Sequence, residues 1–100
     1  MEDDRLAAVA RALGHPARVR ILRMLVAQDA CMGAEIFAGL PLAQSTVSQH
    51  LAVLKRAGLV HATPKGTSTL YCVAAEPLAE LSDALLALSE DRPVCPGKDR

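Results

Sequence analysis

The middle of the sequence contains two helical stretches separated by a turn of about three residues at Pro41-Leu42. The first stretch, Ala34 to Leu40, is short. The second, Gln44 to Ala57, is the clearest helix in the chain, because apolar residues recur at helical spacing and Gly58 follows it. Its apolar stripe comprises Val47, Leu51 and Leu54. Two helices joined so closely predict a helix-turn-helix unit.

Half of the residues are hydrophobic (51%), yet the chain has one Phe, one Tyr and no Trp. The core must therefore be built from Leu, Val, Ile and Ala, which suits packed helices because Ala and Leu are the strongest helix formers. A chain of 100 residues has the length of one domain. On so small a domain, we expect apolar helical faces to be left over and to be covered by a second copy in a homodimer.

Apolar spacing predicts further helices on both sides of the central pair, and alternating residues predict a β-hairpin after it. The expected elements are helices over residues 5–13, from 16 to a break at 28–30, and from 77 to about 89, with strands over 59–63 and 68–73. The stripes expected to be buried are Val19, Leu22, Leu25 and Val26 in the second helix and Leu78, Leu81, Leu85 and Leu88 in the last. This order predicts a mainly α fold with a small β-hairpin, a winged helix-turn-helix. We expect that domain to cover residues 1–90 and residues 91–100 to form a flexible C-terminal tail.

The charges are unevenly distributed although the formal net charge is zero. Residues 5–28 hold five arginines and no acid, residues 36–75 hold no Asp or Glu, and residues 76–91 hold five acids and no base. Zero net charge argues against a general polyanion binder. An acid-free central half can still offer a face compatible with phosphate, unless the clustering arose by chance.

The sequence gives no sign of a membrane segment. No apolar run reaches the roughly 20 residues needed to cross a bilayer. The acidic start, Met-Glu-Asp-Asp, differs from the basic start of a signal peptide. We therefore expect a cytoplasmic protein with no membrane partner.

The polar face of the second central helix predicts contact with double-stranded DNA. It carries short or medium hydrogen-bonding side chains without negative charge, namely Gln44, Ser45, Thr46, Ser48, Gln49 and His50. Such groups can pair with base edges without repelling phosphates. A merely solvated helix face would more often carry Glu and Lys four residues apart. Lys55 on the same helix and Lys65 near the hairpin tip add positive charge for backbone contacts, although a cation at a turn can also be simply solvated.

Two segments resemble the ArsR/SmtB family of metalloregulatory repressors. One is Ala-Leu-Gly-His-Pro-Ala-Arg-Val-Arg-Ile-Leu at residues 12–22, and the other is Leu-Ala-Gln-Ser-Thr-Val-Ser-Gln-His-Leu at 42–51, followed by Leu-Lys-Arg-Ala-Gly-Leu-Val at 54–60. The resemblance implies a winged-helix homodimer whose first and last helices pack across the two-fold axis. It also implies that the dimer represses by binding an operator near its own promoter and that an inducer releases it. The polar residues 44–50 would then face the major groove of two half-sites.

Three cysteines, Cys31, Cys72 and Cys95, are the candidate sensing residues. Many relatives carry Cys-x-Cys before the short third helix, whereas here Gly33 replaces the second cysteine. Three thiolates would suit trivalent arsenic or antimony, ranked ahead of Cd(II) and Zn(II), and no constitutive cofactor is expected. Alternatively, two thiols such as Cys31 and Cys95 form a disulfide or polysulfide, or Cys72 is a small core residue.

The other candidate functions have less support in the sequence. Other relatives bind metal through His and carboxylate pairs on the last helix, but here that helix has Glu80 and Asp83 and no His. We expect His15, His50 and His61 to be structural or DNA-contacting. A winged helix used only for protein contacts would not need the acid-free polar helix. No nucleophile-base pair, glycine-rich phosphate loop or metal-hydrolase motif indicates an enzyme.

Overall fold

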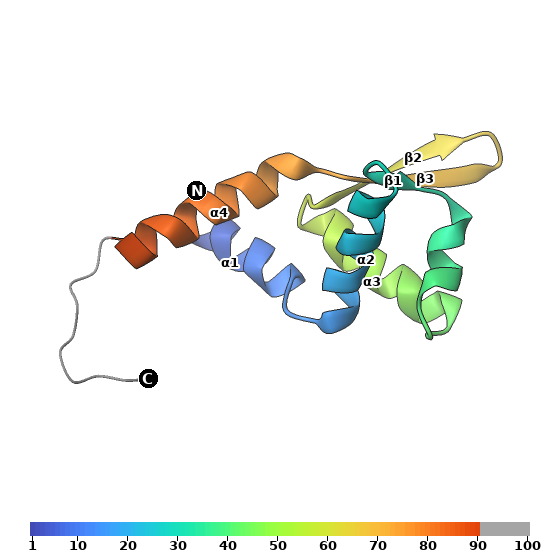
Figure 1. Ribbon diagram of the computed structural model, residues 1–100, viewed down its shortest axis with the longest axis horizontal. Coiled ribbons are helices and arrows are strands. Elements are labelled where there is room, and N and C mark those ends of the chain that lie inside the picture. Colours follow the sequence, from blue (N-terminus) through green and yellow to red (C-terminus); the bar gives the residue numbers. More distant parts are fainter. Residues whose placement is uncertain (91–100) are drawn as a thin grey trace.

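The computed structural model describes residues 1–90, in which a small antiparallel sheet lies towards one end of a group of helices (Figure 1). Its elements are α1 (Asp3–Ala12), α2 (Pro16–Ala27), β1 (Cys31–Met32), the 3-10 helix η1 (Ala34–Gly39), α3 (Gln44–Arg56), β2 (Val60–Lys65), β3 (Ser68–Val73) and α4 (Ala75–Glu90). The β2–β3 hairpin, which is the wing of this fold, projects at one end of the molecule. At the other end, α4 lies beside α1. The predicted winged helix-turn-helix is confirmed.

The sheet differs from the predicted hairpin because it has a third strand. Its order is β1-β3-β2, with Cys31 opposite Cys72 and Met32 opposite Tyr71. A strand of two residues is too short to show alternation, so the sequence pattern could not reveal it. Two more corrections are local: the predicted third helix is a 3-10 helix, and α4 begins two residues before Pro77. Pro77 is tolerated in the first turn because its missing N–H would have no helical partner there.

The predicted break after α2 is a sharp left-handed turn. Asp29 and Ala30 both have positive φ, 58° and 77°. The turn is held by two backbone hydrogen bonds: the Ala30 N–H donates to the Leu25 carbonyl (2.8 Å), and the Val73 N–H donates to the Ala30 carbonyl (2.8 Å). These bonds fix the turn between α2 and β1. Because one of them joins the turn to Val73 of β3, Cys31 lies beside β3.

The core is aliphatic, as the composition predicted. Its buried members are Val9, Ala12, Ile21, Leu22, Leu25, Met32, Ile36, Leu40, Val47, Leu51, Leu54, Ala57, Leu59, Val60 and Leu81. Three residues expected to be buried are instead exposed: Val26 (61%), Leu85 (52%) and Leu88 (62%). Helical spacing correctly marks these faces as apolar, but residues 1–90 of a single copy leave them uncovered.

The start of α2 and the end of α3 are both capped. At the start of α2, the His15 Nδ1 accepts a hydrogen bond from the Ala17 N–H (3.0 Å), which is a structural role. At the end of α3, Gly58 adopts φ 81°. There the Gly58 N–H donates to the Lys55 carbonyl and the Leu59 N–H donates to the Leu54 carbonyl, the Schellman pattern. This cap fixes where α3 stops and where β2 leaves it.

No helix among residues 1–90 is long and apolar enough to cross a membrane.

Candidate nucleic-acid interface

The exposed face of α3 presents most of the polar residues selected from the sequence. Val47, Leu51 and Leu54 turn one side of the helix into the core. On its other sides, Gln44, Ser45, Ser48 and Gln49 are exposed, and Thr46 is partly buried. The helix therefore offers amide and hydroxyl groups to a partner while its apolar stripe holds it in place.

His50 lies differently from the other five residues. It is partly buried, and its Nδ1 accepts a hydrogen bond from the Arg18 Nε (3.3 Å). Its ring centroid lies 4.4 Å from that of His15. Burial, followed by the nearby His15 and then Arg18, lowers the pKa of His50 below its usual value of 6.5. Its side chain thus joins α3 to the start of α2, which the sequence pattern did not indicate.

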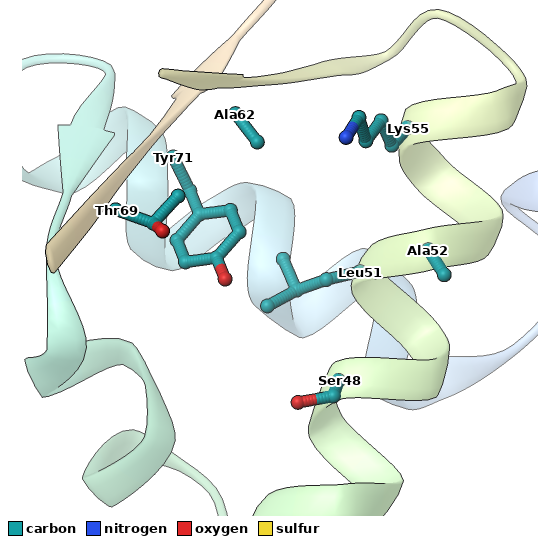
Figure 2. A pocket seen from close by; sticks show the side chains of 7 residues that line it. All are labelled: Ser48, Leu51, Ala52, Lys55, Ala62, Thr69 and Tyr71. Atoms are coloured by element: carbon teal, nitrogen blue, oxygen red, sulfur yellow. The ribbon is translucent and has the colours of Figure 1, made fainter. Parts of the chain in front are cut away.

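A first cavity, of about 270 Å³, lies between α3 and the sheet (Figure 2). Its walls are Ser48, Leu51, Ala52 and Lys55 from the helix and Ala62, Thr69 and Tyr71 from the strands. Lys65 ends β2 at the hairpin tip and is exposed. The Ser68 Oγ donates to the Lys65 carbonyl (3.0 Å), which closes the turn around Gly66. Both lysines selected from the sequence therefore belong to the wing side of α3.

A second cavity, of about 390 Å³, lies on the opposite side of α3. Its lining consists of Ala8, Arg11 and Ala12 from α1, Arg18 from α2, and Val53, Arg56 and Ala57 at the end of α3. The sequence pattern did not indicate that these arginines belong to the interface. The sequence feature that could have pointed to this cavity is the set of five arginines without an acid in residues 5–28. Only the fold brings two of them beside Arg56.

The structure joins Cys31 and Cys72 in a disulfide between β1 and β3. Cys31 is thereby bonded to Cys72, and not to Cys95 as in the redox alternative drawn from the sequence. Cys95 lies outside the described residues, so the three-thiol site stays a prediction. Among residues 1–90, no group of three His, Cys, Asp or Glu side chains is arranged to hold a metal ion.

Residues 15–62 match the family model described as bacterial regulatory protein, arsR family. The chain is 39% identical over 97 residues to the HTH-type transcriptional regulator CmtR of Mycobacterium tuberculosis (strain ATCC 25618 / H37Rv), a match that covers 93% of this chain and 81% of CmtR. It is 44% identical over 71 residues to Rv0081, an uncharacterized HTH-type transcriptional regulator of the same strain. That match covers 71% of this chain but only 62% of Rv0081.

The fold is also similar to solved structures. The crystal structure of the ArsR family transcriptional regulator RHA00566 superposes with a TM-score of 0.77. The superposition covers 93% of this chain and 98% of that one, at 21% sequence identity. At this identity the likeness concerns the arrangement of helices and strands alone.

Proposed function

Because this chain belongs to the ArsR family of bacterial transcriptional regulators, we propose that it is a repressor that binds operator DNA as a homodimer and responds to the chemistry of its cysteines. The family consists of DNA-binding regulators, not enzymes. The observation that carries the proposal is the acid-free polar face of α3, with a cationic wing beside it. Residues 1–90 would form the DNA-binding and dimerisation domain.

The residues of α3 are suited to reading base edges in the major groove. An amide side chain such as Gln44 or Gln49 can donate and accept at once, which matches the N6 and N7 groups of adenine. Hydroxyls such as Ser45 and Ser48 can pair with either kind of group. Lys55 and Lys65 would contact backbone phosphates, which gives affinity but not sequence preference.

Dimerisation would supply a second copy of α3, and therefore a second helix that reads base edges. Helix α4 lies beside α1. It carries an exposed apolar surface formed by Leu85, Leu86 and Leu88. Covering this surface with the same surface of a second copy would remove it from water. The two α3 helices would then read half-sites about one helical turn apart.

The disulfide indicates how a signal would reach the DNA-binding face. Cys31 lies three residues before η1, and Cys72 lies in the wing. In oxidation, the two thiols would give up two protons and two electrons to an oxidant such as hydrogen peroxide, which is reduced to two waters. The bond would then tie the wing to the segment that leads into the helix-turn-helix. The signal acts only insofar as the two forms differ in affinity for DNA.

A second candidate signal uses the same thiols in reduced form. Cys31 and Cys72 are neighbours across the sheet, so together with Cys95 they could supply three sulfurs to trivalent arsenic or antimony. Soft thiolates favour such ions over harder ones. Cd(II) and Zn(II) rank lower, because three thiolates lack the fourth ligand that structural zinc sites take.

One titration tests the proposal and separates the two signals. Reduced protein is bound to a labelled duplex that it has selected from a randomised pool. Hydrogen peroxide, a sulfide donor, arsenite, antimonite, cadmium and zinc are then added separately. Release by peroxide that dithiothreitol reverses, and that Cys31→Ser and Cys72→Ser both abolish, supports the disulfide. Release by arsenite or antimonite supports the three-thiol site.

Two outcomes contradict the proposal. If none of these agents changes binding, the cysteines do not carry the signal. If the protein enriches no sequence from the pool, it is not a sequence-specific repressor, and a winged helix used only for protein contacts becomes the better account.

A further inference from the structure

We propose that the cavity between α1, α2 and α3 holds a backbone phosphate of the duplex that α3 reads, on the side of the helix opposite the wing. The proposal rests on the proposed function, because it needs DNA seated on α3. This phosphate site would be additional to the one at Lys55 and Lys65. It is lined by Arg11, Arg18 and Arg56.

The position of the cavity follows from the periodicity of α3. Arg56 lies seven residues after Gln49, close to two turns, so both side chains leave the helix along one stripe. Ser45 lies one turn before Gln49 on the same stripe. The base-reading residues and the cavity are therefore neighbours on one continuous surface. A duplex seated on Ser45 and Gln49 would bring its backbone to the level of Arg56.

The two sides of α3 have matching features. Lys55 lines the cavity on the wing side, whereas Arg56 lines the cavity on the α1 side. A helix in the major groove has one phosphate backbone on each side of it. The lysines would engage one backbone and the arginines the other, which would centre the helix in the groove.

Arg18 is held in place before any ligand arrives. Its Nη1 donates to the carbonyls of Arg11 and Ala12, both at 3.3 Å, and its Nε donates to the Nδ1 of His50 at 3.3 Å. These bonds engage three of the five guanidinium N–H groups and leave two for an anion. A guanidinium already ordered loses little side-chain entropy on binding, and its geometry suits phosphate oxygens.

Charge complementarity selects an anion as the occupant. Three guanidinium groups line the cavity, and its other lining residues within the described part of the chain are three alanines and a valine, with no carboxylate among them. The lowered pKa of His50, caused by burial and by nearby His15 and Arg18, agrees with positive potential at this place. The alanines leave room for a phosphate to approach the arginines.

The test replaces Arg11 and Arg56 by Gln, singly and together. Arg18 is left intact because its hydrogen bonds join α1, α2 and α3. The matched controls are Arg20→Gln and Arg23→Gln, which remove the same charge from a different groove lined by α2 and residues 40–42. Binding is measured by fluorescence anisotropy between about 50 and 200 mM salt. The probes are a duplex selected by the wild type and a scrambled duplex of equal length, and thermal melts confirm folding.

Each of Arg11→Gln and Arg56→Gln should weaken binding to both duplexes by a similar factor and preserve the ratio between them. The slope of log K against log salt should become shallower by about 0.9 for each phosphate that the variant no longer neutralises. The two control variants should keep the wild-type slope.

A double variant with the wild-type affinity and slope would overturn the phosphate site, as would controls that lose as much affinity as the test variants. Binding of inorganic phosphate in the cavity with no effect on DNA binding would also overturn it. These failures are distinct from a wild type that selects no sequence, which contradicts the proposed function itself.

Discussion

The histidines at residues 15 and 50 show how single side chains connect the reading helix to the rest of the domain. Each uses its Nδ1 as an acceptor, His15 from the Ala17 N–H and His50 from the Arg18 Nε. A protonated Nδ1 can only donate, so adding a proton to His50 removes the Arg18 hydrogen bond. Arg18 in turn lines the cavity on the α1 side of α3. Protonation of His50 would therefore remove one of the three hydrogen bonds that hold that guanidinium.

The lowered pKa of His50 predicts a fold that loses stability in mild acid. The unfolded chain, with an ordinary histidine, binds the proton more readily than the folded one. The free energy of unfolding should therefore fall as the pH drops below about 6.5 and towards the folded pKa. Urea denaturation between about pH 7.5 and about pH 5.5 measures this slope.

His50→Gln should reduce the pH dependence, whereas His61→Gln, at an exposed position on β2, should leave it unchanged. An equal slope for His50→Gln and the wild type would contradict the role given to His50.

At the scale of elements, the junction between α3 and β2 sets the angle between the reading helix and the wing. Gly58 adopts positive φ there and closes the Schellman cap. A Cβ at this position would lie 3.3 Å from the Arg5 Nη2, and the Arg5 Nη1 donates to the Ala57 carbonyl (3.1 Å). The junction thus combines a backbone requirement with a side-chain contact from α1.

Gly58→Ala should destabilise the fold by about 1 to 2 kcal/mol from the left-handed backbone alone, and by more if Arg5 must move. Gly66→Ala is the matched control, since Gly66 also has positive φ but no atom of the described residues beyond its neighbours lies within 4 Å of an added Cβ. Chemical denaturation compares the two variants. If both variants lower the free energy of unfolding equally, the Arg5 contact does not stabilise the junction.

Long periodic elements could be predicted from the sequence, and short or tertiary features could not. Helix α3 could be predicted because Val47, Leu51 and Leu54 recur at helical spacing and form one apolar stripe. Strand β1 has two residues and exists only through its pairing with β3. The sequence likewise could not show that Cys31 lies opposite Cys72, since their proximity depends on the left-handed turn at Asp29-Ala30.

The candidate site divides in the same way. The exposed polar residues of α3 could be identified from their chemistry and helical phase. The arginine cavity could not, because Arg11, Arg18 and Arg56 come from three helices. Its members share no sequence spacing, and only the packing of α1 and α2 against α3 brings them together.

At the scale of the whole molecule, the domain is asymmetric. The wing and α3 lie towards one end of the domain and α4 towards the other (Figure 1). The wing and α3 carry no acid, whereas Leu85, Leu86 and Leu88 are exposed on α4. The acids of residues 76–90 lie on α4, away from the proposed DNA-binding face. This separation fits a protein that binds DNA at one surface and a second copy at another.

Leu85→Glu combined with Leu88→Glu should convert the proposed dimer into a monomer, because two carboxylates would have to be buried at its interface. Analytical ultracentrifugation measures the mass, and anisotropy should show a large loss of affinity for a two-half-site duplex. Val26→Glu, at a residue 61% exposed on α2 and so outside the proposed α1–α4 interface, should remain dimeric. A wild type that sediments as a monomer, or a double variant that stays dimeric, would contradict this assignment.

The exposed face of α3 is the surface that we propose reads a DNA sequence. The most direct measurement is selection from a pool of randomised duplexes by the wild type and by the Gln44→Ala, Ser48→Ala double variant, followed by affinity measurement on the selected sites. The wild type should enrich two related half-sites about 10 base pairs apart. The double variant should bind these sites at least about tenfold more weakly, with relaxed base preference inside each half-site. Selection of the same sequence with unchanged preference by both proteins would show that Gln44 and Ser48 do not read the bases.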